Sequence, residues 1–364
     1  MIVGILGAGQ LARMIALAGY PLGLRFIFLD PSSDACANSL GEHLHGDYND
    51  PRLLAQLAER ADVVTYEFEN VPADVAAFLA AHTQVHPAPK ALAVAQDRLI
   101  EKAFFHDIGI PTAAYSAVDS FESLEQAMSI IGWPAILKSC TMGYDGKGQS
   151  LLKSAEDLKP AWDQLDGVSA VVEAFVPFNR EISIIAARNV SGATVFYPLS
   201  ENLHRGGILR VSKSCDNDPM QKEAEIYISR LMEALDYVGV LALELFEIDG
   251  KLIANEFAPR VHNSGHWTIE GAETSQFENH LRAILDLPLG NTTSVDKTAM
   301  VNFIGGLPLT NDLLTIPNAH LHLYDKEPRK GRKVAHASVR AKTTEELESL
   351  IKKLTTLANQ VDNS

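Results

Sequence analysis

Short apolar runs alternate with segments of helical periodicity along the first hundred residues. The apolar runs predict buried strands, and the segments between them predict helices. Strands and helices that alternate at this spacing form βαβ units, so the pattern predicts a parallel sheet. The predicted strands are 2–6, 25–29 and 63–66, and the predicted helices are 10–18, 51–60 and 73–81.

The pattern changes after a helix predicted at 97–107, which ends at Gly109 with Pro111 beyond it. From about Trp133 onward, short strands are separated by turns that contain Gly, Asn and Asp, which is typical of an α+β domain. A third region begins near Thr293 and is predicted to be rich in strands and to close with a helix. The further predicted elements are strands at 135–138, 171–175, 181–187 and 195–198, a helix at 221–235, a hairpin of 240–248 and 251–256, and the closing helix at 345–357.

Composition and charge narrow the class of protein. The chain has 364 residues, of which 46% are hydrophobic and 21% charged, as in a globular enzyme of two or three domains. Its formal net charge of −15 disfavours nucleic acid as a partner, because nucleic-acid binders usually carry a basic face. Three scattered cysteines indicate neither a disulfide framework nor a zinc site. Signal-peptide features and apolar runs of spanning length are missing, so we expect a cytoplasmic protein with no membrane partner.

A glycine-rich turn, Gly7-Ala8-Gly9, follows the first predicted strand. Glycines permit a tight turn from strand to helix and let a phosphate approach the helix N-terminus. The spacing from Gly7 through Gly9 to Ala12, with Asp30 after the second strand, also fits a dinucleotide-binding fingerprint. The turn alone leaves a nicotinamide or flavin site and a purely structural turn both open.

A second glycine-rich loop follows the strand that delivers Lys138, and it contains Gly143, Gly146 and Gly148. Such a loop can bring backbone N–H groups and lysines close to a polyphosphate. It lacks the Gly-Lys-Ser/Thr ending of a Walker A loop, so P-loop chemistry does not follow. The alternatives are a flexible hairpin tip and a lid that excludes water from a reactive intermediate.

Glu244 and Glu256 lie on the two arms of the hairpin that turns at Asp249-Gly250. Two carboxylates on adjacent strands suit Mg²⁺, with nucleotide phosphates and water as the other ligands. A strict two-residue turn, however, would place Glu244 opposite Asn255 and send Glu256 to the other face. The metal site therefore requires a one-residue bulge or a three-residue loop. Without either, the two glutamates are ordinary solvated carboxylates.

Two polar clusters lie near or beyond this hairpin. In the first, Arg260 and the histidines and asparagine that follow it stand beside the candidate metal site, where an arginine can bind a carboxylate or phosphate with two hydrogen bonds. The second is a basic run at 326–333 in an otherwise acidic chain. It can hold a nucleotide monophosphate at a domain junction, whereas a solvated loop is the alternative for both clusters.

Together these motifs resemble the ATP-grasp superfamily, and within it the 5-(carboxyamino)imidazole ribonucleotide synthase family. The likeness keeps the family's order and spans nearly the whole chain. One departure from the wider superfamily is Ala258, where many members carry an asparagine that can contact a metal or phosphate. The stretches that carry the likeness include GILGAGQLARM (4–14), DRLIEKAFFHDIGIPT (97–112), GYDGKGQ (143–149), NEFAPRVHNSGHW (255–267) and HLYDKEPRKGRKVAHASV (322–339).

The resemblance implies a mixed α/β and α+β protein in three parts. A Rossmann-like pre-ATP-grasp domain with a parallel sheet is expected at 1–96, and an ATP-grasp domain at 97–290 with a mobile lid at about 112–176. A small β-rich domain is expected at 291–364. ATP would lie between two antiparallel sheets. The positions that match nucleotide contacts of the family are Arg98, Lys138, Gly143, Tyr144, Asp145, Gly146, Lys147, Gly148, Gln149, Glu173, Ala174, Phe175, Val176, Glu181, His204, Asn255 and Glu256.

The reaction implied by the resemblance is the ATP- and bicarbonate-dependent carboxylation of 5-aminoimidazole ribonucleotide in purine synthesis. Bicarbonate attacks the γ-phosphate to give carboxyphosphate and ADP, and the aminoimidazole nitrogen then takes up the carboxyl group. Mg²⁺, for which Mn²⁺ can substitute, is implied on Glu244 and Glu256, and the family resemblance suggests a homodimer. Carboxyphosphate is short-lived in water, so a closing glycine loop has a purpose.

We expect Arg260 and His262 to hold bicarbonate or carboxyphosphate and Asp145 to orient the amine; with Lys326 these are the predicted catalytic residues. The predicted substrate-binding residues, with Gln10 and Glu67 at the ribose and the basic run at the 5′-phosphate, are Gln10, Leu11, Glu67, Tyr144, Asn263, Lys326, Arg332 and Lys333. Three other hypotheses on the function stay open: a nicotinamide-dependent dehydrogenase, another ATP-grasp ligase that works through an acyl phosphate, and a non-catalytic nucleotide sensor.

Overall fold

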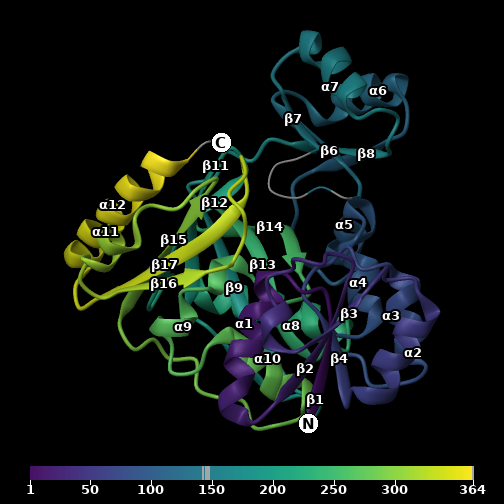
Figure 1. Ribbon diagram of the computed structural model, residues 1–364. Coiled ribbons are helices and arrows are strands. Elements are labelled where there is room, and N and C mark those ends of the chain that lie inside the picture. The colour runs from purple at the N-terminus through teal and green to yellow at the C-terminus, as the bar shows by residue number, and fades with distance from the viewer. Residues whose placement is uncertain (142, 144–147, 363–364) are drawn as a thin grey trace.

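Three lobes make up the computed structural model, which describes residues 1–141, 143 and 148–362 (Figure 1). The N-terminal lobe is built on a parallel sheet with the strand order β3-β2-β1-β4, as predicted. Strand β3 was not predicted from the sequence, because it is a short edge strand with one buried residue, Leu44. The elements of this lobe are β1 (Ile2–Leu6), α1 (Gln10–Gly19), β2 (Arg25–Asp30), β3 (Glu42–His45), α2 (Pro51–Arg60), β4 (Val63–Tyr66), α3 (Ala73–Ala80) and α4 (Pro89–Ala95).

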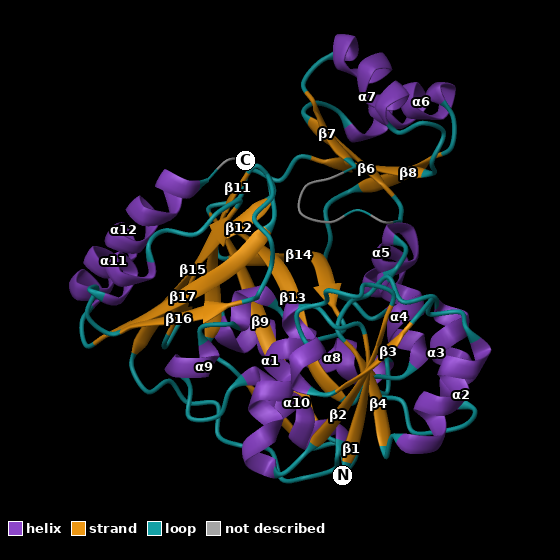
Figure 2. Ribbon diagram, viewed as in Figure 1, coloured by secondary structure: helices purple, strands orange, loops and turns teal. Residues whose placement is uncertain are grey.

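The second lobe projects away from the other two and contains a four-stranded antiparallel sheet with the order β5-β8-β6-β7 (Figure 2). Two helices pack on this sheet and give the lobe a core of its own, which includes Leu124, Leu137 and Val172. This lobe covers the residues at which a mobile lid was expected, about 112–176, and it is called the lid below; its mobility stays a prediction. Its elements are β5 (Tyr115–Val118), α6 (Phe121–Ile131), β6 (Ala135–Ser139), β7 (Gln149–Leu152), α7 (Leu158–Gln164) and β8 (Ala170–Ala174).

A large antiparallel sheet forms the rest of the protein, with the order β14-β13-β9-β11-β12-β15-β17-β16 and β10 beside β9. The C-terminal strands continue this sheet, because β12 pairs with β15, for example at Val211 and Val301. The strands are β9 (Arg180–Arg188), β10 (Thr194–Phe196), β11 (Leu199–Arg205), β12 (Ile208–Cys215), β13 (Gly239–Ile248), β14 (Lys251–Ala258), β15 (Lys297–Ile304), β16 (Ala319–Leu323) and β17 (Lys333–Ala341). The helices are α5 (Arg98–Asp107), α8 (Gln221–Ala234), α9 (Thr268–Gly271), α10 (Gln276–Ile284), α11 (Thr310–Leu314) and α12 (Thr344–Val361).

The hairpin of β13 and β14 contains the bulge that a metal site requires. Its turn is a strict two-residue turn, in which Asp249 and Gly250 have φ angles of 48° and 73°. Toward the open end of the hairpin the register shifts by one residue, because Leu245 pairs with Ala254. Glu244 therefore lies directly opposite Glu256, and Asn255 is the extra residue.

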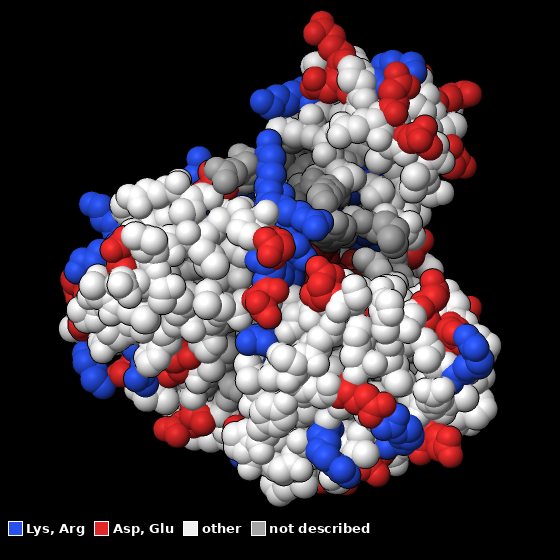
Figure 3. All heavy atoms as spheres, in the orientation of Figure 1, with Lys and Arg blue, Asp and Glu red and all other residues white. Residues whose placement is uncertain are grey.

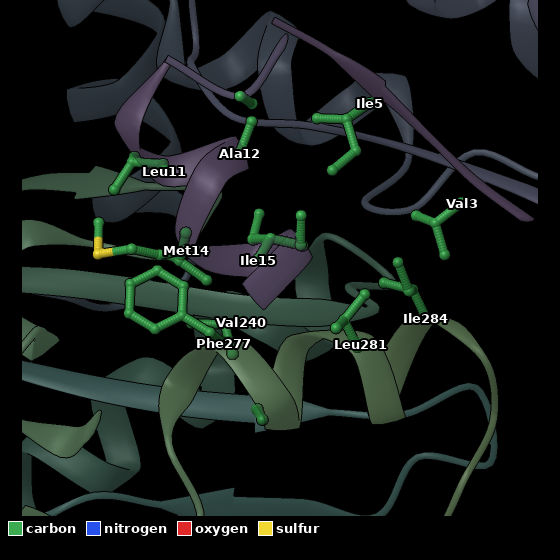
Figure 4. Packing of buried hydrophobic residues seen from close by; sticks show 14 of the residues in the cluster. Val3, Ile5, Leu11, Ala12, Met14, Ile15, Val240, Phe277, Leu281 and Ile284 are labelled. Carbon is green, nitrogen blue, oxygen red and sulfur yellow. The ribbon is translucent and has the colours of Figure 1, made fainter. Parts of the chain in front are cut away.

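The N-terminal lobe is packed firmly against the large sheet. Helix α1 contributes Met14 and Ile15 to a buried cluster that includes Phe277 and Leu281 of α10 and Val240 of β13 (Figure 4). These side chains are essentially excluded from water, and burial of each contributes about 1.5–3 kcal/mol. The packing fixes the glycine turn at the start of α1 relative to the bulged hairpin.

Candidate active site

One cleft of about 710 Å³ lies where the three lobes meet. Lys and Arg side chains gather beside this hollow, with acidic side chains nearby (Figure 3). The cleft is lined by residues from both antiparallel sheets, the glycine turn and the C-terminal strands. The predicted site residues among its lining are Gln10, Leu11, Glu67, Arg98, Lys138, Gly143, Gln149, Glu181, His204, Glu244, Asn255, Glu256, Arg260, His262, Asn263, Lys326 and Lys333.

The carboxylates of Glu244 and Glu256 face each other across the bulge and differ in their electrostatic surroundings. Burial and repulsion from Glu256 raise the pKa of Glu244. Burial also opposes ionisation of Glu256, but attraction to Arg98 and Lys138 outweighs it and lowers the pKa of Glu256. The Nη1 of Arg98 lies 2.7 Å from an oxygen of Glu256. The pair therefore concentrates negative charge that a cation would relieve.

Lys138 reaches the cleft from the lid and is held by a buried ion-pair triad. Its Nζ lies 3.2 Å from Glu173, whose other oxygen lies 3.0 Å from Nζ of Lys102. Burial lowers the pKa of the Lys138 ammonium group, whereas the two lysines outweigh burial and lower the pKa of Glu173. The triad joins α5 to strands β6 and β8 of the lid. Lys102 was not predicted from the sequence. Glu173, which was predicted to contact the nucleotide, is not among the residues that line the cleft, and that contact stays a prediction.

Arg260 and His262 follow β14 and point into the same cleft. The guanidinium group of Arg260 pairs with Glu69, a residue that sequence reasoning missed. Burial opposes ionisation of Glu69, but Arg260 outweighs it and lowers the pKa of Glu69. Glu69 follows the carboxyl end of a parallel strand, where ligand sites are common. This position was the only feature of the sequence that could have marked Glu69 as a site residue. Burial and the neighbouring Arg260 lower the pKa of His262 to about 3, so its ring is neutral at pH 7.

The glycine turn binds a carboxylate of the protein itself. Glu67 accepts hydrogen bonds from the N–H groups of Gly9 and Ala12, the latter at 2.9 Å. A Cβ on Gly7 or Gly9 would lie 2.5 or 2.7 Å from Glu67, so glycine is needed for this close approach. Asp30 is likewise engaged by the Ala8 N–H at 2.9 Å. The helix N-terminus that a dinucleotide would use is occupied, which argues against a nicotinamide site.

Two further pairs flank the cleft. Lys326, from the basic run, donates a hydrogen bond to the side-chain oxygen of Gln10 and so joins the C-terminal strands to the glycine turn. Burial lowers the pKa of Lys326. On the other side, His204 pairs with Glu181. Burial opposes protonation of His204, but the hydrogen bond to Glu181 outweighs it and raises the pKa of His204.

An apolar part of the cleft was not predicted. Phe178 and Phe246 line it and stack with their ring centroids 4.8 Å apart and nearly parallel. Ile136 of the lid and Leu245 lie in the same lining. Flat apolar surfaces of this kind suit the faces of a purine base. Nothing in their spacing along the chain could reveal them, because two separate strands and a loop bring them together.

Several predicted residues do not line the cleft or lie outside the described part of the chain. The N–H groups of Ala174 and Phe175 donate to the carbonyl oxygens of Ala114 and Pro134 at 2.8 and 3.1 Å, so these two donors are already used within the protein. The predicted residues away from the lining are Gly148, Glu173, Ala174, Phe175, Val176 and Arg332. Tyr144, Asp145, Gly146 and Lys147 lie outside the described residues.

The donor set of the facing glutamates fits a hard divalent cation. Mg²⁺ takes carboxylate oxygens and usually keeps water and phosphate oxygens as further ligands. Within residues 1–141, 143 and 148–362, no group of three or more His, Cys, Asp or Glu side chains is arranged to hold a metal. Glu244 and Glu256 would therefore hold a metal together with ligands from the nucleotide. No helix in the same ranges is long and apolar enough to cross a membrane.

The fold and this cleft define the chain as an ATP-grasp enzyme. Residues 103–277 match the ATP-grasp domain family, 1–96 the ribonucleotide synthetase preATP-grasp domain, and 298–350 the phosphoribosylaminoimidazole carboxylase C-terminal domain. An N5-carboxyaminoimidazole ribonucleotide synthase of Pseudomonas aeruginosa is 52% identical over 96% of this chain and 98% of its own. One of Vibrio vulnificus is 42% identical over all of this chain and 96% of its own.

Solved structures give the same result. The N5-carboxyaminoimidazole ribonucleotide synthetase of Thermus thermophilus superposes with a TM-score of 0.93 at 51% identity, over 98% of each chain. The synthase of Aspergillus clavatus in complex with ADP and 5-aminoimidazole ribonucleotide superposes with a TM-score of 0.92 at 30% identity, over 99% of this chain and 98% of its own. The chain belongs to the N5-carboxyaminoimidazole ribonucleotide synthase family of ATP-grasp ligases.

Proposed function

We propose that the cleft uses ATP and bicarbonate to carboxylate the amine of 5-aminoimidazole ribonucleotide, with the residue roles given below. The observation that carries the proposal is that one cavity gathers a carboxylate pair for a metal, cations for phosphates, and polar residues at the glycine turn. A phosphoryl-transfer enzyme needs the first two features, and an acceptor nucleotide needs the third.

The nucleotide end of the cleft lies between the lid and the large sheet. Phe178, Phe246 and Ile136 would cover the base, and Glu181 of β9 and His204 of β11 also line the cleft. Arg98 and Lys138 would neutralise the phosphates, since each already presents its cationic group to the cleft. A Mg²⁺ ion on Glu244 and Glu256 would supply charge neutralisation for the transferring phosphoryl group.

Arg260 and His262 would hold bicarbonate beside the γ-phosphate. Attack of a bicarbonate oxygen on phosphorus breaks the bond to the β–γ bridging oxygen and gives carboxyphosphate and ADP. Arg260 can give two parallel hydrogen bonds to the resulting carboxylate. The amine of the ribonucleotide then attacks the carboxyl carbon, phosphate leaves, and the amine loses a proton.

The acceptor would lie between the glycine turn and the basic run. Gln10 and Glu67 line the cleft and would meet the ribose, and Lys326 and Lys333 line it and would bind the 5′-phosphate. Lys326 and Gln10 are hydrogen-bonded without a ligand, so the N-terminal lobe and the C-terminal part of the large sheet, which would both contact the acceptor, are already linked. Asn263 lies in the same lining.

The direct test is phosphate release from Mg·ATP with and without bicarbonate and the ribonucleotide. We expect strong release only when both are present. Lys326→Ala should raise KM for the ribonucleotide by about tenfold or more, because a charged hydrogen bond is lost. Lys330→Ala, which removes an exposed lysine of the same loop, is the matched control and should stay within about twofold. Slow hydrolysis that ignores the ribonucleotide would disprove the proposed acceptor.

A homodimer is part of the proposal only through the family resemblance. Light scattering of the purified protein at several concentrations would measure its mass directly. A mass of one chain, which is 39.6 kDa, at every concentration would contradict the dimer.

A further inference from the structure

The two ring nitrogens of His262 have different neighbours. Nε2 points toward the carboxylate of Glu244, 3.2 Å away. Nδ1 lies 2.9 Å from the hydroxyl oxygen of Ser264 and 3.4 Å from the backbone nitrogen of the same residue. Ser264 belongs to a short 3₁₀ turn (Asn263–Gly265) directly after His262, so the serine is held beneath the ring by local structure.

These neighbours select one tautomer of the neutral ring. A backbone N–H can only donate, so Nδ1 must accept from Ser264 and carries no proton. A neutral imidazole carries its one proton on the other nitrogen, so the proton lies on Nε2, which faces Glu244. The contacts of Nδ1 with Ser264 therefore select the Nε2–H form.

A buried chain of hydrogen bonds supports Ser264 from behind. Asn202 of β11 donates through Nδ2 to the hydroxyl of Ser183 on β9 at 3.0 Å, and Ser183 donates to the hydroxyl of Ser264 at 2.7 Å. Each hydroxyl has one proton, so this direction leaves the proton of Ser264 for Nδ1 of His262. Ser212 of β12 lies 2.8 Å from both Asn202 Oδ1 and the Ser264 carbonyl oxygen.

The three serines of this chain are buried. Ser183, Ser212 and Ser264 are 0% exposed, whereas Asn202 is 8% exposed and also lines the cleft. Water cannot easily replace a missing partner there, so loss of one hydroxyl leaves its neighbours without a hydrogen bond. Three strands of the large sheet thus contribute polar side chains to one point beneath the cleft, where a packed core would otherwise be apolar.

We propose that Ser264, supported by Ser183 and Asn202, is a positioning residue that holds His262 in its Nε2–H form. His262 then presents a hydrogen-bond donor to the bicarbonate-derived group and does not act as its base. This inference rests on the proposed function for the identity of that group. It assigns no contact with substrate to the serines, which act only through the histidine ring.

The tautomer can be measured directly by nitrogen NMR of protein labelled with ¹⁵N in its 12 histidines. Long-range proton–nitrogen spectra distinguish the two neutral tautomers, and His262→Gln identifies the signal of this ring. We expect the wild-type protein to show Nε2–H for His262. A signal of the Nδ1–H form would overturn the proposal, and this measurement needs neither activity nor a serine variant.

Ser264→Ala should remove the preference between tautomers and lower kcat/KM for bicarbonate by about tenfold or more, since the donor is no longer aimed. KM for ATP should stay within about twofold. Ser183→Ala, one hydroxyl further from the ring, should cause the same changes to a smaller degree and serves if Ser264→Ala folds poorly. Ser338→Ala removes an equally buried hydroxyl that has no hydrogen-bond partner among the described residues, and it is the matched control.

Unchanged tautomer and kinetics in both Ser264→Ala and Ser183→Ala would refute the positioning role while the proposed function stands. Equal losses in Ser338→Ala would refute it as well, because the effect would then be general to buried serines. A wild-type protein that ignores the ribonucleotide would instead refute the proposed acceptor. The tautomer measurement would still decide whether Ser264 orients His262.

Discussion

Glu101 places a carboxyl group in the interior beside the candidate metal pair. Its side chain is 2% exposed and accepts a hydrogen bond from the Phe257 N–H at 2.7 Å. Burial and repulsion from Glu256 raise the pKa of Glu101 to about 8, so the folded protein holds this carboxyl protonated at pH 7. Glutamine has the shape of the protonated acid and keeps the acceptor oxygen. We predict that Glu101→Gln stabilises the protein at alkaline pH.

The sign follows from proton binding. In the unfolded chain Glu101 ionises at its ordinary value of 4.5, so between pH 4.5 and about 8 the folded state holds one proton more. Stability therefore falls as pH rises through this window and stays at its lowest above it. At about 1.4 kcal/mol per pH unit, the interval between these two pKa values sets an upper bound of about 5 kcal/mol on the loss of unfolding free energy. Because the site can relax, we expect Glu101→Gln to gain about 1–3 kcal/mol near pH 8.5 and almost nothing near pH 5.

Urea unfolding of the wild-type and variant proteins, at about pH 5, 7 and 8.5 without nucleotide or divalent metal, measures the difference. Glu125→Gln, which removes an exposed carboxylate on α6, is the control and should show no such trend. If Glu101→Gln were less stable than wild type near pH 8.5, the buried carboxyl would be ionised and well paired. A gain of equal size at every pH would also contradict the reasoning, since it would not come from titration.

Three further results are expected. Glu173→Gln should destabilise the protein by about 3–5 kcal/mol because it leaves two buried ammonium groups without a carboxylate. Lys102→Met should cost less, since the remaining pair is neutral; thermal unfolding of the two variants tests this order. Gly9→Ala would bring a Cβ within 2.7 Å of Glu67 and should raise KM for the ribonucleotide by about tenfold, with KM for ATP unchanged in steady-state assays. Mg²⁺ with ADP should raise the melting temperature of the wild-type protein more than ADP alone, and Glu244→Gln should lose this increment.

The pattern of the sequence predicted local features well and long-range pairings poorly. Alternation of strands and helices predicted the parallel sheet, and the turn at Asp249-Gly250 predicted a hairpin whose use as a metal site required a bulge. The structure contains that bulge, with Asn255 as the extra residue. Glu69 and Lys102 were missed, because each matters only through a partner distant in sequence, Arg260 for the first. Local periodicity carries no information on such pairs, which tertiary packing decides.

The cationic side chains of the cleft gain their orientation from acidic or polar partners within the protein. An acidic chain can therefore assemble a phosphate site, because each cation is desolvated and aimed by its partner before any ligand enters. An incoming phosphate or carboxylate replaces the partner that the cation already has, so the net gain in binding free energy is modest. The ligand is nevertheless oriented well, because the cation is already held in place. Such an exchange suits a ligase that must align three reactants and still release ADP and phosphate. The pairs that support this argument are Arg98 with Glu256, Lys138 with Glu173, Arg260 with Glu69, and Lys326 with Gln10.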